Sequence, residues 1–413
     1  MRYHRPKGTR DILPDEALLR EWVLDRFKRV VKVYGFEEIQ TPTFESTELF
    51  VRSSGETSDI ATKQMYSFKD KKGREISLRP EGTAGVIRAV LENRIKIPCR
   101  LFYIESMFRY ERPQKGRFRE HLQFGVEVLG EKSPKVDTEI IEMAVEMLKE
   151  VGVEVNTIIN TVGCRKCQPE FKKALSNFLE ENRNGLCKDC QIRAEKNPLR
   201  VFDCKDENCQ RIYENAPKIE DYLCDDCRDH FNDLKKTLKI DYRVNRKLVR
   251  GLDYYTKTVF EFESEKLGAK SSLGGGGRYD NLVEEMGGSK TPALGFGLGI
   301  DRILLAMKRR PEIKRMKVFI APLGKEAIKE GEGILKKLRD AGISAIMDYE
   351  EKRLKEYLHR ANLYEARYSI IIGSDELSKG VYSLKDMNKG DQLSLNQEEL
   401  LEFLKERCSQ DQS

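Results

Sequence analysis

Long hydrophobic runs are missing from this sequence of 413 residues. No stretch approaches the roughly 18 apolar residues that a membrane-spanning helix needs, so we expect no membrane partner. The opening residues, MRYHRPKGTRDILPDE, also lack the apolar segment of a secretory signal. Histidine is scarce, and its four positions, 4, 121, 230 and 359, are too scattered to suggest a metal cluster. These features predict a soluble, cytoplasmic protein.

Neither sign of charge predominates. The 75 Lys and Arg residues nearly balance the 69 Asp and Glu residues, which leaves a formal net charge of +6 and a pI near 8.6. Charged residues make up 35% of the chain, above the usual value of about one quarter, and this indicates a solvated surface rich in ion pairs. Such a charge permits a polyanionic partner but does not require one.

A dinucleotide-binding fingerprint is also missing. The segment GFGLG, at residues 295–299, does not have the GxGxxG spacing, and no ribose-binding acid follows it in a strand-helix-strand unit. This excludes a Rossmann domain. At about 100 to 200 residues per domain, the length predicts two to four domains of another kind.

Hydrophobic periodicity predicts the main elements. Apolar residues at helical spacing predict an N-terminal helix over 16–34. Two β-prone arms around a polar break predict a long antiparallel hairpin over 101–130. After residue 317, β-prone segments alternate with helical segments over 326–341 and 353–363, which predicts a separate α/β domain with a partly parallel sheet.

The predicted hairpin has one unusual polar face. Counting by two places Glu105 with Arg109 on the first strand, and Gln123, Gly125 and Glu127 together on the second. An amide, a bare glycine and a carboxylate in a row would leave room for a small polar ligand above the strand. The alternative is an outer sheet face in water.

Two further segments carry polar side chains suited to a ligand. Glu81 and Thr83, in SLRPEGTAG, lie where a strand gives way to a helix and could bind an ammonium group, although Thr83 alone is better explained as a helix N-cap. In RGLDYYTKTVFEF, the guanidinium of Arg250 suits a phosphate or carboxylate that gains charge in a transition state. Tyr254 and Tyr255, on opposite faces of the strand that they begin, could line a pocket. A surface arginine with core tyrosines is the alternative.

Glycines cluster in GGGGRYD and GFGLGIDR. Gly274–Gly277, on a β-prone segment, would let a flat ligand lie against bare backbone. In the second segment Arg302 falls in the first turn of a helix, where it suits a phosphate chain. A pair of flexible turns beside a core helix is the alternative.

Eight of the ten cysteines lie between residues 163 and 243, among charged segments of helical character, and this change of composition predicts a helical insertion. Three CxxC pairs and one wider pair favour two zinc sites of four thiolates each over free thiols, with the pairing left open. The cysteines are Cys164, Cys167, Cys187, Cys190, Cys204, Cys209, Cys224 and Cys227.

Together these segments resemble the histidyl-tRNA synthetase family of class II aminoacyl-tRNA synthetases. RGLDYYTKTVFE and GGGGRYD are peculiar to that family, FRYERPQKGRF and GFGLGIDR are similar to class II motifs 2 and 3, and TPTFE is similar to motif 1. The resemblance implies an α/β protein with an α+β core. Its antiparallel-sheet catalytic domain would comprise residues 1–162 and 244–310, interrupted by the cysteine-rich insertion at 163–243 and followed by an anticodon-binding α/β domain at 317–413.

The resemblance also implies an activity. Histidine and ATP, with Mg²⁺ on the phosphates, would form histidyl-adenylate, and histidine would then pass to the 3′ end of tRNA(His); a homodimer is implied through motif 1. Each candidate residue receives a role: Arg109 and Arg250 at the α-phosphate and the histidine carboxylate, Arg302 at the γ-phosphate, Glu81 and Thr83 at the ammonium group, Gln123 near the carboxylate, Glu127 at the imidazole, Tyr254, Tyr255 and Tyr279 around the side chain, and Arg112 and Gln114 near the tRNA acceptor end.

Two other functions stay open at this point. A non-catalytic, histidine-sensing paralogue, similar to the regulatory subunit of ATP phosphoribosyltransferase, would keep the histidine pocket without the tRNA chemistry. The three arginines and the C-terminal domain argue against it. A zinc-dependent nucleic-acid-binding protein would instead depend on the cysteines. One departure from the family concerns motif 2: members often have a histidine where this chain has Leu122, and here His121 lies one place earlier.

Overall fold

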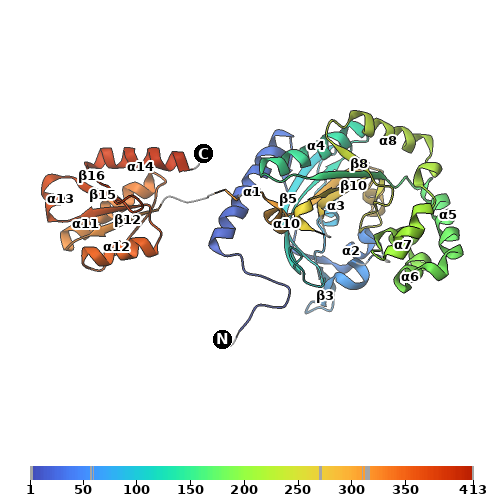
Figure 1. Cartoon of the computed structure of the whole chain (residues 1–413), viewed down its shortest axis with the longest axis horizontal. Helices are drawn as coiled ribbons and strands as arrows, with labels where there is room; N and C mark the ends of the chain where they lie inside the picture. The colour runs from blue at the N-terminus through green and yellow to red at the C-terminus, as the bar shows by residue number, and fades with distance from the viewer. Residues whose placement is uncertain are drawn as a thin grey trace. The chain divides into compact units, whose positions relative to one another are not determined.

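The computed structural model describes residues 3–55, 58, 60–268, 272–308, 310–311 and 317–411. The chain forms two compact units, Met1–Arg310 and Pro311–Ser413, each with its own hydrophobic core (Figure 1). Among the helices of the described residues, none combines the length and the apolar character needed to cross a membrane.

The first unit is built on an eight-stranded sheet. Neighbouring strands are antiparallel except at the two edges, where β1 pairs with β5 and β7 pairs with β8 in parallel. The predicted hairpin is confirmed as β5 and β6. Across the sheet the order is β1 (Glu37–Glu38), β5 (Cys99–Phe108), β6 (Glu120–Leu129), β11 (Ala293–Gly299), β10 (Ser272–Arg278), β9 (Thr256–Glu263), β7 (Asn156–Thr161) and β8 (Tyr242–Val244).

One face of this sheet is covered by helix α1 (Pro14–Val33), which packs against α4 (Pro134–Glu150). The predicted N-terminal helix is confirmed, and its apolar stripe is buried: Leu19, Val23, Phe27, Val30 and Val31. Phe27 meets Phe124 edge on, with 5.4 Å between ring centroids, and Phe124 stacks on Phe102. Because side chains alternate along a strand, the polar residues of β6 face the opposite side of the sheet.

Smaller elements border that opposite side. A three-stranded antiparallel sheet, in the order β2 (Phe44–Ser46), β4 (Glu75–Leu78) and β3 (Tyr66–Lys69), leads into helix α3 (Thr83–Glu92). Helix α2 (Thr47–Ser54) and a π-helical turn at Ile60–Gln64 connect its strands, α9 (Leu282–Glu285) follows β10, and α10 (Ile300–Ala306) follows β11.

The cysteine-rich segment is helical, as its composition predicted. It contains α5 (Gln168–Glu181), α6 (Lys188–Lys196), α7 (Glu207–Ile212) and α8 (Asp225–Thr237), joined by 3₁₀ turns at Arg183–Gly185, Pro198–Asp203, Tyr213–Asn215 and Ile219–Tyr222. The cysteines lie inside the small apolar core of this segment, beside Phe171, Leu175 and Tyr213.

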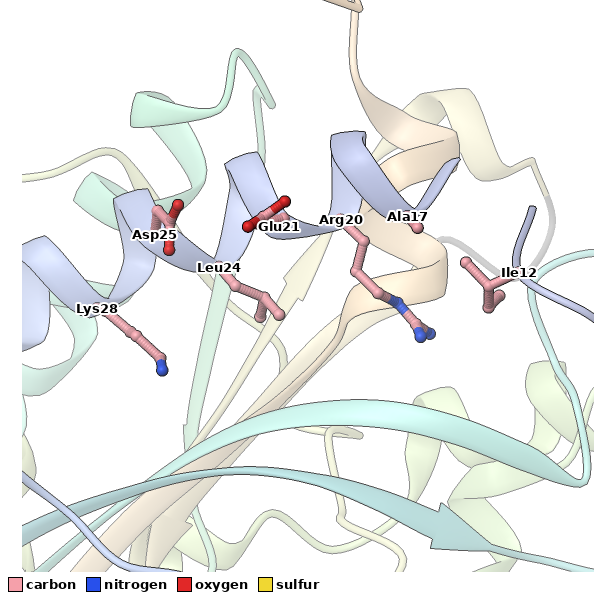
Figure 2. Close-up of a pocket in the computed structure, with 7 residues that line it drawn as sticks. All are labelled: Ile12, Ala17, Arg20, Glu21, Leu24, Asp25 and Lys28. Carbon is pink, nitrogen blue, oxygen red and sulfur yellow. The ribbon is translucent and has the colours of Figure 1, made fainter. Parts of the chain in front are cut away.

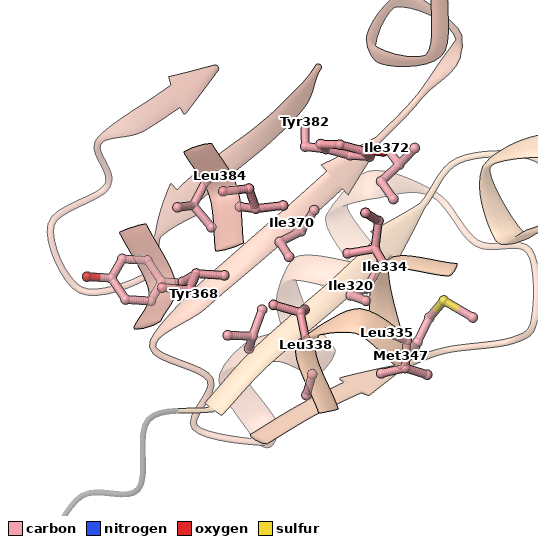
Figure 3. Close-up of a cluster of buried hydrophobic side chains, with 14 of the residues drawn as sticks. Ile320, Ile334, Leu335, Leu338, Met347, Tyr368, Ile370, Ile372, Tyr382 and Leu384 are labelled. Carbon is pink, nitrogen blue, oxygen red and sulfur yellow. The ribbon is translucent and has the colours of Figure 1, made fainter. Parts of the chain in front are cut away.

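The second unit is an α/β domain with the partly parallel sheet that the sequence predicted. The strand order is β13 (Ser344–Met347), β12 (Lys317–Pro322), β14 (Tyr368–Ile372), β15 (Tyr382–Asp386) and β16 (Gln392–Leu395); the first three are parallel and the others antiparallel. Its helices are α11 (Lys325–Asp340), α12 (Leu354–Leu363), α13 (Ser374–Lys379) and α14 (Gln397–Asp411). Figure 3 shows the core between sheet and helices, where Ile320 and Ile370 lie near Ile334 and Leu338.

Candidate active site

Five glycines lie together on the polar face of the large sheet. Gly125, Gly297 and Gly275 lie opposite one another on β6, β11 and β10, and Gly295 and Gly277 form the next row. The absence of a Cβ lets polar and aromatic side chains approach the backbone closely here: Tyr103 at Gly125, Gln123 at Gly297, Glu127 at Gly295, Arg250 at Gly275 and Tyr255 at Gly277. We call these five residues the glycine patch. The sequence predicted that all of Gly274–Gly277 would let a flat ligand lie against bare backbone; only Gly275 and Gly277 face this side of the sheet, and Gly274 and Gly276 face the other.

Glu127 closes one end of the glycine patch. Its carboxyl group is buried, and it accepts hydrogen bonds from the Thr83 hydroxyl at 2.8 Å and from the Tyr279 hydroxyl. Burial raises the pKa of Glu127 to about 8, and nearby Glu81 adds to the effect, while the hydroxyl donors oppose it. Glu127 is therefore largely protonated at neutral pH and offers a hydrogen-bonding site for a nitrogen heterocycle.

Glu81 lies at the start of α3. Its carboxylate accepts from the backbone N–H groups of Thr83 at 2.7 Å and Ala84 at 3.0 Å, so the helix cap is the Glu81 side chain. The prediction that Thr83 serves as an N-cap is wrong, because its hydroxyl instead donates to Glu127. Burial raises the pKa of Glu81, against the backbone donors and Arg109, which lower it. Two carboxyl groups thus lie close to one hydroxyl.

Tyr103 occupies the space that the sequence left open above β6. It lies opposite Gly125, and its hydroxyl accepts a hydrogen bond from Gln123 Nε2 at 2.8 Å. A Cβ on Gly82, before α3, would also meet the Tyr103 ring. The prediction of empty space above β6 is therefore only partly correct. Glu105 lies on the same face but interacts with other residues. Its carboxylate accepts a hydrogen bond from the backbone N–H of Thr41 and lies 2.8 Å from Arg79 Nη1.

Arg109 follows β5 directly. Its Nε donates to the carbonyl of Pro80 at 2.7 Å, which brings the guanidinium beside Glu81. His121 lies near both Arg109 and Arg117, and burial together with these two cations lowers the pKa of His121 to about 3. The imidazole of His121 is therefore neutral at physiological pH and contributes no positive charge to the site.

Arg250 and Arg302 approach the glycine patch from its other end. Arg250 Nη1 lies 3.2 Å from the Glu261 carboxylate, and a Cβ on Gly275 would lie 3.0 Å from the same nitrogen. Among the described residues, Arg250 Nε is buried without a hydrogen-bond partner. Burial lowers the pKa of Arg302, as does Arg117, whereas Glu261 raises it. Glu261 thus lies near both arginines. Sequence reasoning missed it, although its pairing with Gly275 across β9 and β10 puts it on this face.

The two consecutive tyrosines lie differently from the prediction. Strand β9 begins at Thr256, so Tyr254 and Tyr255 precede it, and their rings pack together with centroids 4.7 Å apart. The prediction of opposite strand faces is wrong, because the backbone has not yet become extended there. Tyr254 also packs against Tyr279 at 5.4 Å, and its hydroxyl lies 3.5 Å from the Thr83 hydroxyl.

The turn of the β5–β6 hairpin packs against α10. Gln114 and Arg117 pair across the turn, and a Cβ on Gly116 would meet the side chains of Leu305 and Arg302. Arg112 and Gln114 both lie exposed at this turn.

A groove of about 420 Å³ lies elsewhere in the unit, along α1 (Figure 2). Its lining comes entirely from the N-terminal segment and includes none of the candidate residues: Ile12, Ala17, Arg20, Glu21, Leu24, Asp25 and Lys28. The candidate active site is therefore the glycine patch with its polar border.

The border residues are linked in a ring by electrostatic interactions and hydrogen bonds. Electrostatic interactions link Glu81 to Arg109, His121 to Arg109 and Arg117, Arg302 to Arg117 and Glu261, and Arg250 to Glu261 and the two tyrosines; hydrogen bonds link Tyr254 through Thr83 to Glu127. Three guanidinium groups from distant parts of the sequence thus border one surface. Such an arrangement can neutralise a polyphosphate beside a buried carboxyl group that can hydrogen-bond to a small polar group.

Comparisons with known proteins show the family to which this chain belongs. The model of the family described as Histidyl-tRNA synthetase matches residues 8–167 and 203–303, and that of the Anticodon binding domain matches residues 317–407. The histidine–tRNA ligase of Pelotomaculum thermopropionicum is 45% identical to this chain over 98% of both proteins. That of Desulfitobacterium hafniense is 45% identical over 100% of both.

Solved structures give the same result. Apo histidyl-tRNA synthetase from S. aureus superposes with a TM-score of 0.80 at 33% identity, over 98% of this chain and 100% of that one. A Bacillus halodurans structure, described as an ATP phosphoribosyltransferase regulatory subunit/histidyl-tRNA synthetase, has a TM-score of 0.65 at 22% identity, over 91% of this chain and 99% of that one, and so shares the fold. The chain belongs to the histidyl-tRNA synthetase family.

Proposed function

We propose that this chain joins histidine to the 3′ end of tRNA(His) in two steps at the glycine patch. In the first, a carboxylate oxygen of histidine attacks the α-phosphorus of ATP, the bond to the β-phosphate oxygen breaks, and pyrophosphate leaves. In the second, a hydroxyl of the terminal adenosine of the tRNA attacks the histidyl carbonyl and AMP leaves. Mg²⁺ enters with ATP as part of that substrate, since phosphate oxygens are its preferred ligands.

Histidine would lie at the Glu127 end of the patch. The imidazole would hydrogen-bond to the Glu127 carboxyl group, with Tyr254, Tyr255 and Tyr279 around it. The ammonium group would be bound by Glu81 and Thr83, and Gln123 would approach the carboxylate. A buried carboxyl group matched to an imidazole would reject apolar amino acids, because such a substrate would leave it without its partner.

The arginines would bind the reacting groups. Arg109 and Arg250 would neutralise the α-phosphate and the attacking carboxylate, and Arg302 would bind the γ-phosphate. This step needs positioning and charge neutralisation, with no protein nucleophile. The observation that carries the proposal is that these three arginines lie around the glycine patch, on the same face of the sheet as the buried Glu127 carboxyl group.

The tRNA would contact both units. Arg112 and Gln114, exposed at the turn of the β5–β6 hairpin, would lie near the acceptor end, where basic and amide side chains commonly contact phosphate. The second unit, which matches the anticodon-binding domain, would bind the other end of the tRNA. A cytoplasmic location follows from this substrate.

A homodimer is part of the proposal. The three-stranded sheet, whose strand β2 begins within motif 1, exposes large apolar side chains on one face: Phe44 is 55% exposed and Phe68 is 48% exposed. Exposed aromatic residues on one sheet face suit a subunit interface. The eight cysteines of the insertion would bind structural Zn²⁺, which would supply no step of the reaction.

Histidine-dependent exchange of labelled pyrophosphate into ATP tests the proposal. We expect exchange with the wild type and a loss of roughly a hundredfold or more in Arg250→Ala, since one charge-stabilising group is removed from the transition state. Arg243→Ala, which removes an exposed arginine paired with Glu263 on the same sheet, is the matched control and should retain exchange. A wild-type protein that binds histidine without exchange would instead indicate the histidine-sensing paralogue.

A further inference from the structure

The eight cysteines of the insertion form two separate groups of four. In each group the four Sγ atoms all lie within 4.8 Å of one another. The outer group contains Cys164, Cys167, Cys224 and Cys227, and the inner group contains Cys187, Cys190, Cys204 and Cys209. The inner group lies between the two halves of the outer group in the sequence, so the pairing that the spacing left open is a nested one.

The sulfur positions suit a tetrahedral metal ion. Four thiolates at about 2.3 Å from zinc, at tetrahedral angles, place their sulfurs about 3.8 Å apart. Cys164 Sγ lies 3.7 Å from Cys167 Sγ and 3.9 Å from Cys224 Sγ, and Cys187 Sγ lies 3.8 Å from Cys204 Sγ. A disulfide would require about 2.05 Å. The distances therefore fit metal thiolates and exclude disulfide bonds.

The two groups share one pattern of backbone hydrogen bonds to sulfur. In the outer group Cys164 Sγ accepts from the N–H of Lys166 at 3.4 Å, and Cys167 Sγ accepts from the N–H of Cys224 at 3.2 Å. The inner group repeats both contacts. Cys204 Sγ accepts from the N–H of Asp206 at 3.4 Å, and Cys209 Sγ accepts from the N–H of Cys187 at 3.2 Å.

This repetition has a physical meaning. Donors aimed at sulfur stabilise the thiolate charge that metal ligands carry, and they fix the ligand geometry as outer-shell partners do in metal sites. In both groups the first cysteine of each pair is partly exposed and the second is buried. Two independent segments thus adopt the same ligand arrangement, which chance contacts among thiols would not produce.

The elements around the inner group are short. Helices α6 and α7 have nine and six residues, and 3₁₀ turns link them. Helices of this length are marginal without tertiary support. A bound metal would supply that support, because the free energy of binding becomes free energy of folding when ligands come from separate segments.

Residues next to both cysteine groups form hydrogen bonds or ion pairs with the loop that contains Arg250 and Tyr255. The 3₁₀ turn Pro198–Asp203, between the second and third inner cysteines, supplies Arg200, whose Nη2 lies 2.8 Å from Asp253, and Asn197 just before it donates to the same carboxylate at 3.1 Å. Next to the outer group, Gln168 Nε2 donates to the carbonyl of Tyr255 at 3.3 Å.

We propose that the insertion binds two zinc ions, one in each tetrathiolate group, and that the metal-bound insertion positions the Arg250–Tyr255 loop through Arg200 and Asn197. The first half of this proposal is independent of the proposed reaction. The second half rests on it, since the loop would bind histidine. Arg200 is a positioning residue, because it acts on the site through Asp253.

Metal analysis of the purified full chain tests the zinc sites. We expect two zinc ions per chain in the wild type, released by a thiol-modifying mercurial. Cys164→Ser and Cys187→Ser should each retain one, and Cys99→Ser, a cysteine in β5 that belongs to neither group, should retain two. Fewer than two zinc ions in the wild type, or iron in their place, would overturn the assignment even where a variant fails to fold.

Arg200→Gln tests the link to the loop. With both zinc ions retained, we expect faster backbone hydrogen exchange at residues 249–257 and a rise of roughly threefold to tenfold in the KM for histidine, the size expected from losing one partly buried ion pair. Hydrogen exchange at α4 should not change. In Arg200→Gln kcat should fall by a smaller factor than the KM for histidine rises, and Arg200→Lys should partly restore that KM. Arg183→Gln, an exposed arginine of the same insertion, is the control. Unchanged loop exchange and KM in Arg200→Gln would contradict the link, whereas a wild type without ligase activity would leave the zinc count standing.

Discussion

Glu127 is a fully buried carboxyl group with two hydroxyl donors and a second carboxyl group nearby. Its raised pKa makes it a neutral group in the ligand-free protein at pH 7. Free imidazole has a pKa of about 6.5. Between pH 6.5 and pH 8 the Glu127 carboxyl group is therefore protonated and the imidazole is neutral, so the two groups share one proton. That proton gives the pair the character of an ion pair without a net charge in the pocket.

The stability of the protein should respond to this residue with a defined sign. Folding raises the pKa of Glu127 from 4.5 to about 8, so the folded state retains a proton that the unfolded state loses. The contribution of Glu127 to the free energy of unfolding is therefore fully present below pH 4.5 and is lost progressively as the pH rises to 8. At about 1.4 kcal/mol per pH unit the cost reaches at most roughly 5 kcal/mol.

Glu127→Gln should consequently gain stability relative to the wild type as the pH rises. We expect the difference in unfolding free energy between variant and wild type to shift in favour of the variant from pH 5 to pH 9, measured by urea unfolding. The same variant should lose most histidine-dependent pyrophosphate exchange. A difference that stays constant with pH would mean that Glu127 is already ionised in the folded protein at pH 5.

Asp137 shows the opposite case, a buried carboxylate with a lowered pKa. Burial would raise its pKa, but Arg278 and His230 hold it below the usual value, and Thr258 donates at 2.6 Å. Asp137→Ala should cost up to roughly 3 to 5 kcal/mol of unfolding free energy, because the buried Arg278 loses its nearest carboxylate and keeps only Asp280, at 3.3 Å, and two backbone carbonyls as partners. Glu150→Ala, at the end of the same helix, breaks an exposed pair with Arg29 and should cost less than about 1 kcal/mol. Comparable losses in thermal denaturation would contradict this account.

At the scale of elements, Gly297 and Gly276 lie on opposite faces of the large sheet and have different surroundings. A Cβ on Gly297 would meet only the far end of the Gln123 side chain, at 2.5 Å, whereas a Cβ on Gly276, on the other face, would meet backbone of β11. A flexible side chain can move, but a backbone carbonyl in a central strand cannot without disturbing the ladder.

These positions predict contrasting variants. Gly297→Ala should fold with a melting temperature near that of the wild type but raise the KM for ATP or histidine, since it displaces the Gln123 amide and adds a methyl group to the glycine patch. Gly276→Ala should lower stability by roughly 1 to 3 kcal/mol, the range typical of overpacking. Calorimetry and pyrophosphate exchange on both variants separate the two effects. Equal loss of stability would contradict the assignment of faces.

The same scale shows what the sequence could predict. The hairpin, helix α1 and the alternation in the second unit were predictable, because each depends on periodicity within one segment. Period-two counting also put Gln123, Gly125 and Glu127 on one face. It could not show that Tyr103 lies over Gly125, nor that Glu261 lies beside Arg250, because these contacts depend on which strands become neighbours.

Turn geometry and thiol pairing were likewise beyond local reasoning. Tyr254 and Tyr255 were predicted to begin a strand that in fact begins at Thr256, two residues after Tyr254, since β-propensity does not mark where the backbone becomes extended. The nested grouping of the cysteines required the path of four short helices. In each case the missing information was a long-range contact.

For the whole molecule, the division into Met1–Arg310 and Pro311–Ser413 predicts separable activities. The ring of candidate residues lies entirely within the first unit, and the match to the anticodon-binding domain lies entirely within the second. A fragment of residues 1–310 should retain histidine-dependent pyrophosphate exchange within roughly tenfold of the full chain while losing most aminoacylation of tRNA(His). Its circular dichroism and melting transition report whether it folds. A folded fragment without exchange would show that the second unit takes part in histidine activation.

The position of β11 has a consequence for synthesis on the ribosome. This strand is the last of the large sheet to be made, yet it lies between β6 and β10, near the middle. Until about residue 299 has left the exit tunnel, a nascent chain carries two incomplete half-sheets whose inner edges lack their shared partner, and such edges favour intermolecular pairing. Asp301 then pairs with Arg10 and Arg20 of the first-made segment, so the catalytic unit cannot close until nearly all of it has been translated. Ribosomes that stall before this point would release chains prone to aggregation, which makes early chaperone contact advantageous for this fold.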